Sequence, residues 1–577
     1  GVTGIDKMAH MRPGATGQIE VAGAGVALEA QRQLHLADPQ LAGIATEQGL
    51  GLQAQGHIAP GLGLEVEGRT EVVHTLATQG QADLLATPGV VILQRGTGIA
   101  FAREHGGVVL QVAAQAQLGA VGEGDLRRPR GRGGASVVGT GAGAGITAEL
   151  LTRAGLDVVL IEEGPLRTSS DFNQKESEAY RTLYQESAAR RTLDGAISIM
   201  QGRCVGGTTV INWTSSFRTP DSTLRHWQEV YGLSDFTTEA MAPWFEQAER
   251  RLNMVPWTIP PNLNNEVLRT GATKLGISSA VIPRNVKGCW NLGSCGLGCP
   301  TNAKQSMLVT SIPAALNAGA RLFYQTRAHK LDIQNGQVKG LLCVPIRLNG
   351  DKVSDQTMRV VAKHYVVAGG AINSPALLRR SDAPDPHGLL GGRTFLHPVS
   401  FSAGIFDERI EGWQGAPQSL YSDHFVHDAP LQGPIGFKVE AAPLHPGMAS
   451  ILMGGHGQRL MTRFQQYPHT QMMLSLMRDG FHPESVGGKV RMHLDGSAVL
   501  DYPLTDYVLD GFRRSLLAMA EIQFAAGAKV VRPFHEQSDD YSTWAAAKAA
   551  IAAFDMKPLL TGAGSAHVMG GCGMAST

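Results

Sequence analysis

"ASVVGTGAGAGITAELLTRAGLDVVLIEEG", residues 135–164, reads as one strand, one tight turn, one helix and a second strand. "ASVVGT" (135–140) and "DVVLIEEG" (157–164) are short apolar runs typical of buried strands. Between them "AGITAELLTRAG" (144–155) has helical spacing and ends in Gly155, a residue that commonly caps helices. This order is the βαβ unit of a parallel sheet, so the sequence predicts an α/β fold that begins at about residue 135.

The turn inside this unit carries a dinucleotide-binding pattern. Gly139 makes the tight turn, Gly141 lets the backbone approach a pyrophosphate, and Ala144 is small enough for the helix to pack on the strand. Gly143 lies in the same loop, and the following helix offers free N–H groups to phosphates. Glu162, about twenty residues further on, stands where an acidic residue binds a ribose hydroxyl. Glycine turn, helix, second strand and acid together predict a dinucleotide site.

Two later blocks extend the predicted site. In "GRCVGGTTVINWTSSFRTP" (202–220), the glycines allow close backbone approach and the polar side chains offer hydrogen bonds. "YVVAGGAINSPALLRRS" (365–381) reads as a buried strand, a glycine pair and a helix. The candidate cofactor-binding residues are Gly139, Gly141, Gly143, Ala144, Glu162, Arg203, Gly206, Gly207, Thr208, Asn212 and Gly369.

Composition excludes several classes of protein. The 577 residues include 50 basic and 50 acidic side chains, which gives no footprint for nucleic acid and no polybasic membrane patch. No apolar run reaches the roughly 18 residues that cross a bilayer, and no secretion signal is visible at the first residues. Six cysteines in so long a chain do not form a disulfide framework.

Residues 1–134 differ from the rest of the chain. They contain one aromatic residue, Phe101, and one lysine, Lys7, and they are rich in Gly, Ala, Gln and Leu. Aromatic side chains supply much of the area that a core buries, so this composition is poor for a packed domain. A strand-like piece, "PGVVILQ" (88–94), is not bracketed by turn signals. Three interpretations stay open: a flexible extension, a poorly packed domain, or sequence that never evolved to fold.

With "GSAHVMGGCGM" (564–574), these blocks make residues 135–577 resemble the glucose–methanol–choline (GMC) oxidoreductases, FAD enzymes that oxidise alcohols. Four motifs in the right order carry the resemblance, and "NWTSSFRTP" and "GLGCPTNAKQS" are similar to bacterial alcohol oxidoreductases of the family. The resemblance implies a Rossmann-like FAD-binding domain made of discontinuous segments, and a substrate domain built on an antiparallel sheet capped by helices. The predicted division is 1–134 atypical, 135–395 mainly FAD-binding, 396–555 mainly substrate-binding, and 556–577 the start of an active-site segment.

The resemblance also assigns a role to His567. In the family, the histidine at this position lies near the flavin and takes the alcohol proton while the carbon hydrogen leaves as hydride to flavin N5. Histidine suits this because its ordinary pKa of about 6.5 lets it accept a proton near neutral pH. The family's chain continues past this loop and carries a second catalytic residue, so we expect Thr577 to be a break and the chain on its own to retain flavin weakly. His397, in a predicted substrate-domain strand (393–406), is interpreted as structural.

The loop "CWNLGSCGLGCP" (289–300) places Cys289, Cys295 and Cys299 at C-x5-C-x3-C. Three thiolates on a glycine-rich loop can hold an iron–sulfur cluster, and a similar run occurs in cytochrome-linked sugar dehydrogenases of the family. The alternative is a structural role, as a loop clasp or a disulfide. Zinc is disfavoured because its structural sites usually need four ligands.

The leading hypothesis is an FAD-dependent oxidoreductase acting on a small-molecule alcohol. Its rivals are a nicotinamide-dependent Rossmann dehydrogenase and an inactive remnant of such an enzyme. Oxygen, a quinone and an electron-acceptor protein all stay open as the oxidant. The location also stays open between the cytoplasm and a periplasmic or membrane-associated site in a bacterium.

Overall fold

The computed structural model describes residues 92–93, 99–104, 107–112, 134–354 and 356–573, and divides the chain into two compact units, 1–122 and 123–577. In the first unit, three described strands form an antiparallel sheet in the order β1-β2-β3: β1 (Ile92–Leu93), β2 (Ile99–Glu104) and β3 (Gly107–Val112). Most of the atypical segment 1–134 lies outside the described residues, so the interpretations of it stay predictions.

The second unit contains the parallel sheet that the sequence predicts. Its strand order is β10-β5-β4-β14, with β4 (Gly134–Val138), β5 (Asp157–Ile161), β10 (Arg321–Phe323) and β14 (His364–Val367) all parallel. Helix α4 (Ala142–Arg153) connects β4 to β5, and α10 (Gly370–Arg380) follows β14. Ala144 and Ala148 of α4 are fully buried against strand residues such as Val137. The predicted βαβ unit and α/β fold are confirmed.

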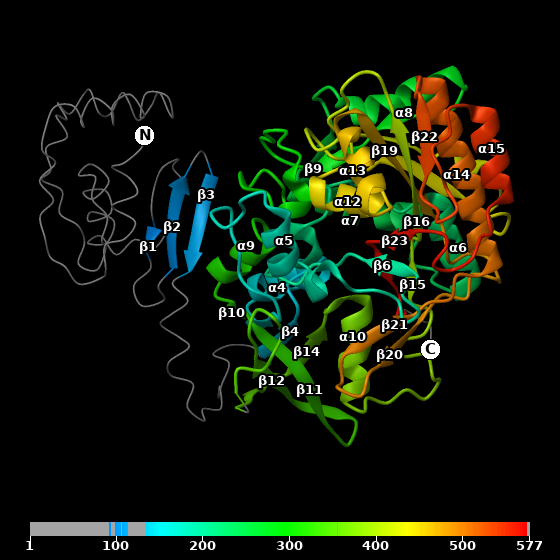
Figure 1. Cartoon of the computed structure of the whole chain (residues 1–577). Coiled ribbons are helices and arrows are strands. Elements are labelled where there is room, and N and C mark those ends of the chain that lie inside the picture. The colour runs from blue at the N-terminus through cyan, green and yellow to red at the C-terminus, as the bar shows by residue number, and fades with distance from the viewer. Residues whose placement is uncertain (1–91, 94–98, 105–106, 113–133, 355, 574–577) are drawn as a thin grey trace, which may run out of the picture. The chain divides into compact units, whose positions relative to one another are not determined.

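A second, mostly antiparallel sheet of eight strands lies in the same unit (Figure 1). Its order is β6-β23-β16-β19-β18-β17-β8, and β22 pairs with β16. The bounds are β6 Ile197–Ile199, β8 Ala280–Val281, β16 Val399–Ile405, β17 Leu420–Ser422, β18 Phe437–Ala441, β19 Thr470–Met477, β22 Val530–Pro533 and β23 Ala563–Ser565. Strands from residues 197 to 565 therefore meet in one sheet, as the discontinuous arrangement predicts.

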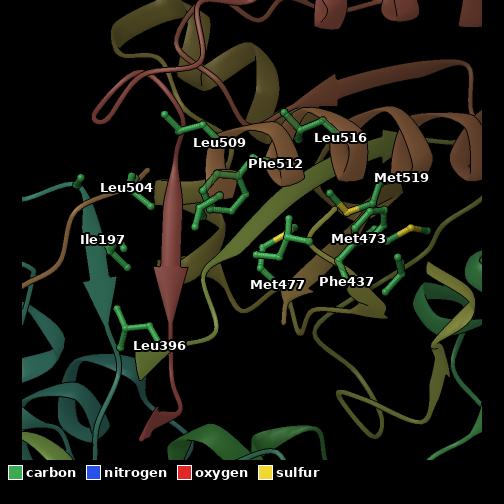
Figure 2. Packing of buried hydrophobic residues seen from close by; sticks show 14 of the residues in the cluster. Ile197, Leu396, Phe437, Met473, Met477, Leu504, Leu509, Phe512, Leu516 and Met519 are labelled. Carbon is green, nitrogen blue, oxygen red and sulfur yellow. The ribbon is translucent and has the colours of Figure 1, made fainter. Parts of the chain in front are cut away.

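The largest apolar core covers one face of this sheet (Figure 2). The helices α14 (Asp506–Ala526) and α8 (Leu263–Lys274) pack there, and Phe512 and Met519 of α14 meet Phe437 and Met473 of the strands. Burying each such side chain contributes about 1.5 to 3 kcal/mol. The methionines of β19 belong to this core or to the smaller cluster on the other face.

Alternation along β16 shows which residues face the other way. Ser402 donates a hydrogen bond to Gln523 of α14 at 2.6 Å, so the even-numbered positions of β16 face the helices. Val399 and Phe401 consequently project from the opposite face, as side chains alternate along a strand. His397, two residues before Val399, continues the same row.

The other elements of the second unit are short helices, hairpins and peripheral strands. They are α5 Glu176–Leu183, η2 Gln185–Ala188, η3 Gly207–Val210, α6 Asp221–Tyr231, α7 Thr238–Leu252, β7 Met254–Pro256, β9 Pro283–Asn285, η4 Ser294–Leu297, α9 Ser311–Asn317, β11 Thr326–Gln334, β12 Gln337–Pro345, β13 Met358–Val360, β15 Phe395–Leu396, α11 His424–His427, α12 Pro446–Leu452, α13 Gly457–Gln465, η5 Tyr467–His469, β20 Lys489–Met492, β21 Ala498–Asp501, α15 Trp544–Ala553 and β24 Val568–Met569. Within the described residues, no helix combines the length and apolarity needed to span a membrane.

Candidate functional site

A cavity of about 820 Å³ opens at the carboxyl ends of β4, β5 and β14. Ligands of open α/β sheets bind at this edge, and the volume suits a small-molecule or cofactor site. Of the residues predicted from the sequence, those that line it are Gly139, Gly141, Gly143, Glu162, Arg203, Gly207, Thr208, Gly369 and His567. The structure therefore brings segments from residues 139 to 567 to one cavity.

Two glycines in the lining are required by close backbone contacts. Gly139 has φ +103°, and a Cβ there would lie 2.5 Å from the carbonyl oxygen of Ala368. Gly207 has φ +56°, and its Cβ would lie 2.8 Å from the Cα of Gly141. The loop after β4 therefore touches both the loop after β14 and the start of η3. A side chain at Gly139 or Gly207 would clash with the neighbouring backbone. With glycine at both positions, the backbone stays accessible to a ligand.

Glu162 is held rigidly at the end of β5. Its carboxylate accepts hydrogen bonds from Thr140 Oγ1 at 2.5 Å and from the Gly164 N–H at 2.8 Å. The Gly206 N–H donates to the same Thr140 oxygen at 2.9 Å, so the second glycine block is tied to the acid. Burial raises the pKa of Glu162 to about 7, although these hydrogen bonds favour the charged form. The predicted ribose acceptor is thus fixed in position by three loops.

The neighbouring acid, Glu163, has different partners. Arg203 and Arg327 each lie 3.1 Å from its carboxylate. Burial opposes ionisation, but the two guanidinium groups hold the pKa of Glu163 below its ordinary value. Arg203 also donates to the Leu348 carbonyl at 2.8 Å, while its Nη2 is buried with no partner among the described residues. One cationic N–H group therefore stays available beside the cavity.

His567 contacts a second histidine. The rings of His397 and His567 are 4.2 Å apart, centre to centre, at 61°. His397 Nε2 accepts hydrogen bonds from the backbone N–H groups of His567 (2.9 Å) and Ala566 (3.4 Å). Two donors aimed at Nε2 require it to be unprotonated, so neutral His397 carries its proton on Nδ1. Burial, with a smaller effect of His567, keeps the pKa of His397 well below its ordinary value and so maintains this neutral form.

His567 lines the cavity, and its side chain is exposed there. Desolvation by the surrounding protein lowers its pKa below 6.5, and the charge of Lys438 lowers it further. His567 is therefore neutral at pH 7 and able to accept a proton.

Comparison with known proteins shows the family of this chain. Residues 180–399 match the family model described as GMC oxidoreductase. An uncharacterised GMC-type oxidoreductase of Mycobacterium tuberculosis is 33% identical over 402 residues, which are 69% of this chain and 60% of that protein. The chain belongs to the GMC oxidoreductase family.

Two further relatives agree with this assignment. A long-chain-alcohol oxidase of Arabidopsis thaliana is 29% identical over 410 residues, covering 69% of this chain and 52% of that protein. The fold is similar to the crystal structure of pyridoxine 4-oxidase from Mesorbium loti, with a TM-score of 0.53 at 15% identity over 77% of this chain and 89% of that one. The chain spans 60% and 52% of the lengths of the two curated relatives.

GMC oxidoreductases bind FAD, and the cavity of this member fits that group. The glycine contacts leave the backbone open for a pyrophosphate at the N-terminus of α4. Glu162 offers a carboxylate for a ribose hydroxyl, and the unpartnered Nη2 of Arg203 offers a cationic donor. His567 lies on the same cavity, where the reacting end of the cofactor would be held.

Three predicted cofactor-binding residues do not line the cavity of this GMC oxidoreductase. Ala144 is buried on the side of α4 that packs on the strands, as its predicted packing role requires. Gly206 contributes through its backbone N–H, which donates a hydrogen bond to Thr140 Oγ1. The carbonyl of Asn212 accepts a hydrogen bond from Lys304 Nζ at 2.8 Å, and its side-chain Oδ1 is buried without a partner in the described part of the chain.

The geometry gives no support to the predicted iron–sulfur site. Among the described residues, no group of three His, Cys, Asp or Glu side chains is arranged to hold a metal ion. Each thiol has its own partner: Cys295 accepts from Arg284 at 3.5 Å, Cys289 accepts from a backbone N–H at 3.4 Å, and Cys299 pairs with a hydroxyl at 3.5 Å. The three cysteines are also free of disulfides, so only the structural loop role of the earlier alternatives fits this geometry.

A buried lysine stabilises this loop. Lys304 is 2% exposed, and its Nζ donates to the carbonyls of Val210 and Asn212 in the second glycine block and to that of Cys295. Burial lowers its pKa to about 8. The cysteine loop is thus tied to the cavity wall through Lys304.

His397 is the main site residue that the sequence did not identify. Its position follows from the pairing of β15 with β24, in which Phe395 lies opposite Met569 and Leu396 opposite Val568. This long-range pairing, together with that of β16 with β23, brings residue 397 to residue 567. The sequence feature that could have pointed to His397 is a histidine within the short, mostly apolar segment that precedes β16.

Proposed function

We propose that this protein uses FAD to oxidise an alcohol to an aldehyde or a ketone. The observation that carries the proposal is the placement of His567 on the same cavity as the glycine loops and Glu162. When bound, FAD would supply the acceptor for the hydride that leaves the carbinol carbon. The name of the Arabidopsis relative, a long-chain-alcohol oxidase, supports an alcohol as the donor.

In this proposal His567 takes the hydroxyl proton. Loss of that proton from oxygen and of hydride from carbon leaves the carbonyl product, so the reaction balances. A neutral imidazole is needed, and the lowered pKa of His567 supplies it near pH 7. A positioned base contributes roughly 10²- to 10⁴-fold to the rate.

His397 acts as a positioning residue. Its Nε2 fixes the backbone of Ala566 and His567, and its ring packs against that of His567. Both contacts restrict the direction from which His567 approaches the alcohol. Placement errors of about 1 Å cost on the order of 10²-fold in rate.

The direct test is the visible spectrum of the purified chain, loaded with FAD, before and after anaerobic addition of an alcohol panel. We expect a flavin spectrum that bleaches with at least one alcohol and returns with an oxidant. A chain that binds FAD but is not bleached by any alcohol would refute the proposed reaction. Binding of a nicotinamide cofactor without flavin would favour the rival dehydrogenase.

The pH dependence gives a second prediction. Because only neutral His567 accepts a proton, kcat/KM should rise with pH and reach a plateau, with the acid limb below pH 6.5. The variant Lys438→Met removes a cation that disfavours protonated His567, so its acid limb should lie at higher pH. Steady-state kinetics from pH 5 to 9 measure both limbs. An unchanged limb would show that Lys438 does not influence the reacting base.

A third prediction concerns His397. His397→Phe removes the Nε2 acceptor but keeps a ring, so kcat should fall about 10- to 100-fold with a smaller change in KM. His397→Asn restores an acceptor and should recover part of kcat. A merely structural role predicts equal loss of folded protein in both variants and unchanged kcat per bound flavin, which the flavin absorbance of each preparation distinguishes.

A further inference from the structure

A buried carboxyl group on β18 has no polar partner. Glu440 is 3% exposed, and among the described residues it forms no hydrogen bond and no ion pair within 4.0 Å. Burial raises its pKa to about 7, while the nearby charge of Lys438 opposes this shift. Burying a polar group without a hydrogen-bond partner costs free energy of folding. Titratable groups in such environments are found preferentially at functional sites.

The sheet register places Glu440 on the face that carries His397. In one row across the strands, Gly564 lies opposite Val399, Val399 opposite Leu476, and Leu476 opposite Lys438. The neighbouring row runs from Phe401 through Leu474 to Glu440 and Tyr421. The two rows are two residues apart along each strand, and each is one residue out of step with the positions that pack on α14, so both lie on the opposite face.

Lys438 stands two residues before Glu440 on β18. Its Nζ is 3.5 Å from the ring centre of Phe217 and 4.7 Å from that of Tyr421, and it makes no ion pair within 4.0 Å with a described residue. Its charge reaches His567, whose pKa it lowers. The ammonium group therefore lies toward β17, beside Tyr421, and acts on His567 through its charge.

The residues of this face between the polar groups and His567 are apolar and belong to one cluster, in which only the partly buried members are accessible to a ligand. Val399 and Leu474 are buried, and Phe401 and Leu476 are partly buried beside them. Three strand spacings of about 4.8 Å separate β23, which leads to His567, from β18, so the two ends lie roughly 14 Å apart. An extended molecule along this face would meet a base at one end, aliphatic side chains in the middle, and Lys438 with Glu440 at the other end.

We propose that Glu440 and Lys438 recognise a second hydroxyl group on the alcohol, separated from the oxidised carbinol by an apolar segment. This inference deepens the proposed function and rests on it. A hydroxyl can donate to the carboxyl of Glu440 and accept from the ammonium of Lys438. A substrate ammonium would be repelled by Lys438, and a substrate carboxylate would be repelled by Glu440 and by Asp423, whose charge also acts on Lys438.

The test compares four donors of equal length: 1-octanol, 1,8-octanediol, 8-hydroxyoctanoate and 8-amino-1-octanol. For the FAD-loaded full chain, kcat/KM for the diol should exceed that for 1-octanol by about 10- to 100-fold, the usual effect of a hydrogen bond to a charged group. Glu440→Leu should abolish this preference, and Glu440→Gln, which keeps an acceptor, should retain part of it. Glu229→Leu, at an exposed acid of α6, is the matched control and should leave the preference unchanged.

A second readout separates this inference from the reaction. The midpoint of thermal unfolding should rise more with 1,8-octanediol than with 1-octanol in the wild type, and equally with both in Glu440→Leu. Selective stabilisation by the diol without oxidation of any alcohol would uphold the recognition and refute the proposed function. Oxidation of diol and 1-octanol with equal kcat/KM, or a preference for 8-hydroxyoctanoate that Lys438→Met removes, would overturn the recognition while the proposed function stands.

Discussion

His567→Ala should lower kcat/KM for alcohol oxidation by about 10²- to 10⁴-fold while the protein keeps its flavin. The imidazole is the neutral, cavity-facing base that our proposal requires, and its removal leaves water as the only proton acceptor at that position. The backbone N–H of residue 567 still donates to His397, so the loop should keep its conformation. Anaerobic reduction of the bound flavin, followed at its visible absorbance, measures the rate of the chemical step directly.

His387→Ala is the matched control, because His387 is an exposed histidine outside the cavity. It should reduce flavin at the wild-type rate. A His567→Ala variant that also reduces flavin at the wild-type rate would contradict the assignment of the base. Partial recovery by added imidazole would support it, since the side chain is open to the cavity.

Local sequence patterns predicted the part of the site that local structure builds. The βαβ unit, its glycine turn and the acid at the end of β5 lie within about thirty residues, and each depends on nearby backbone conformation. Gly139 illustrates this: its φ of +103° is what the tight turn from β4 into α4 imposes. The family motifs added His567 and the two later blocks, which the structure brings to the same cavity.

Residues whose position depends on long-range pairing were not predictable in this way. His397 reaches His567 through the pairings of β15 with β24 and of β16 with β23, and Glu440 reaches the face of Val399 through the register of β16, β19 and β18. A single sequence shows that these side chains interrupt apolar strands, but it does not show which strands become neighbours. Buried, poorly partnered polar groups on the face of His397 therefore emerged only from the structure.

The cysteine loop shows a case in which the spacing left two alternatives open, a cluster and a structural role. C-x5-C-x3-C is compatible with a cluster, but the chain directs Arg284 and Lys304 into this region, both of them almost fully buried. Lys304 is occupied by three backbone carbonyls and Arg284 by Thr214, the Trp213 carbonyl and Cys295. The contacts of Lys304 fix the cysteine loop (289–300) against the second glycine block (202–220). The cysteines therefore lie among partners that suit a structural role.

Gly139→Ala should have the largest effect on cofactor retention. The new methyl group would lie 2.5 Å from the carbonyl oxygen of Ala368, and alanine at φ +103° is strained wherever space exists. Backbone strain of about 1 to 3 kcal/mol and overpacking of about 1 to 3 kcal/mol together predict a loss of roughly 2 to 6 kcal/mol in the free energy of unfolding. Because relief of the clash must move the loop after β4 or the loop after β14, both of which line the cavity, bound flavin should be lost as well.

Gly143→Ala separates these two effects within the same loop. No atom lies within 4 Å of a Cβ at residue 143, its φ is not positive, and it stands in the first turn of α4, where alanine is favoured over glycine by about 0.5 to 1 kcal/mol. Its unfolding midpoint should therefore equal or exceed that of the wild type. Flavin absorbance per polypeptide and the midpoint of thermal unfolding, measured on both variants, separate loss of flavin from loss of stability. A Gly139→Ala variant with wild-type stability and full flavin content would refute the close backbone contact, and with it the placement of the phosphate-binding turn against β14.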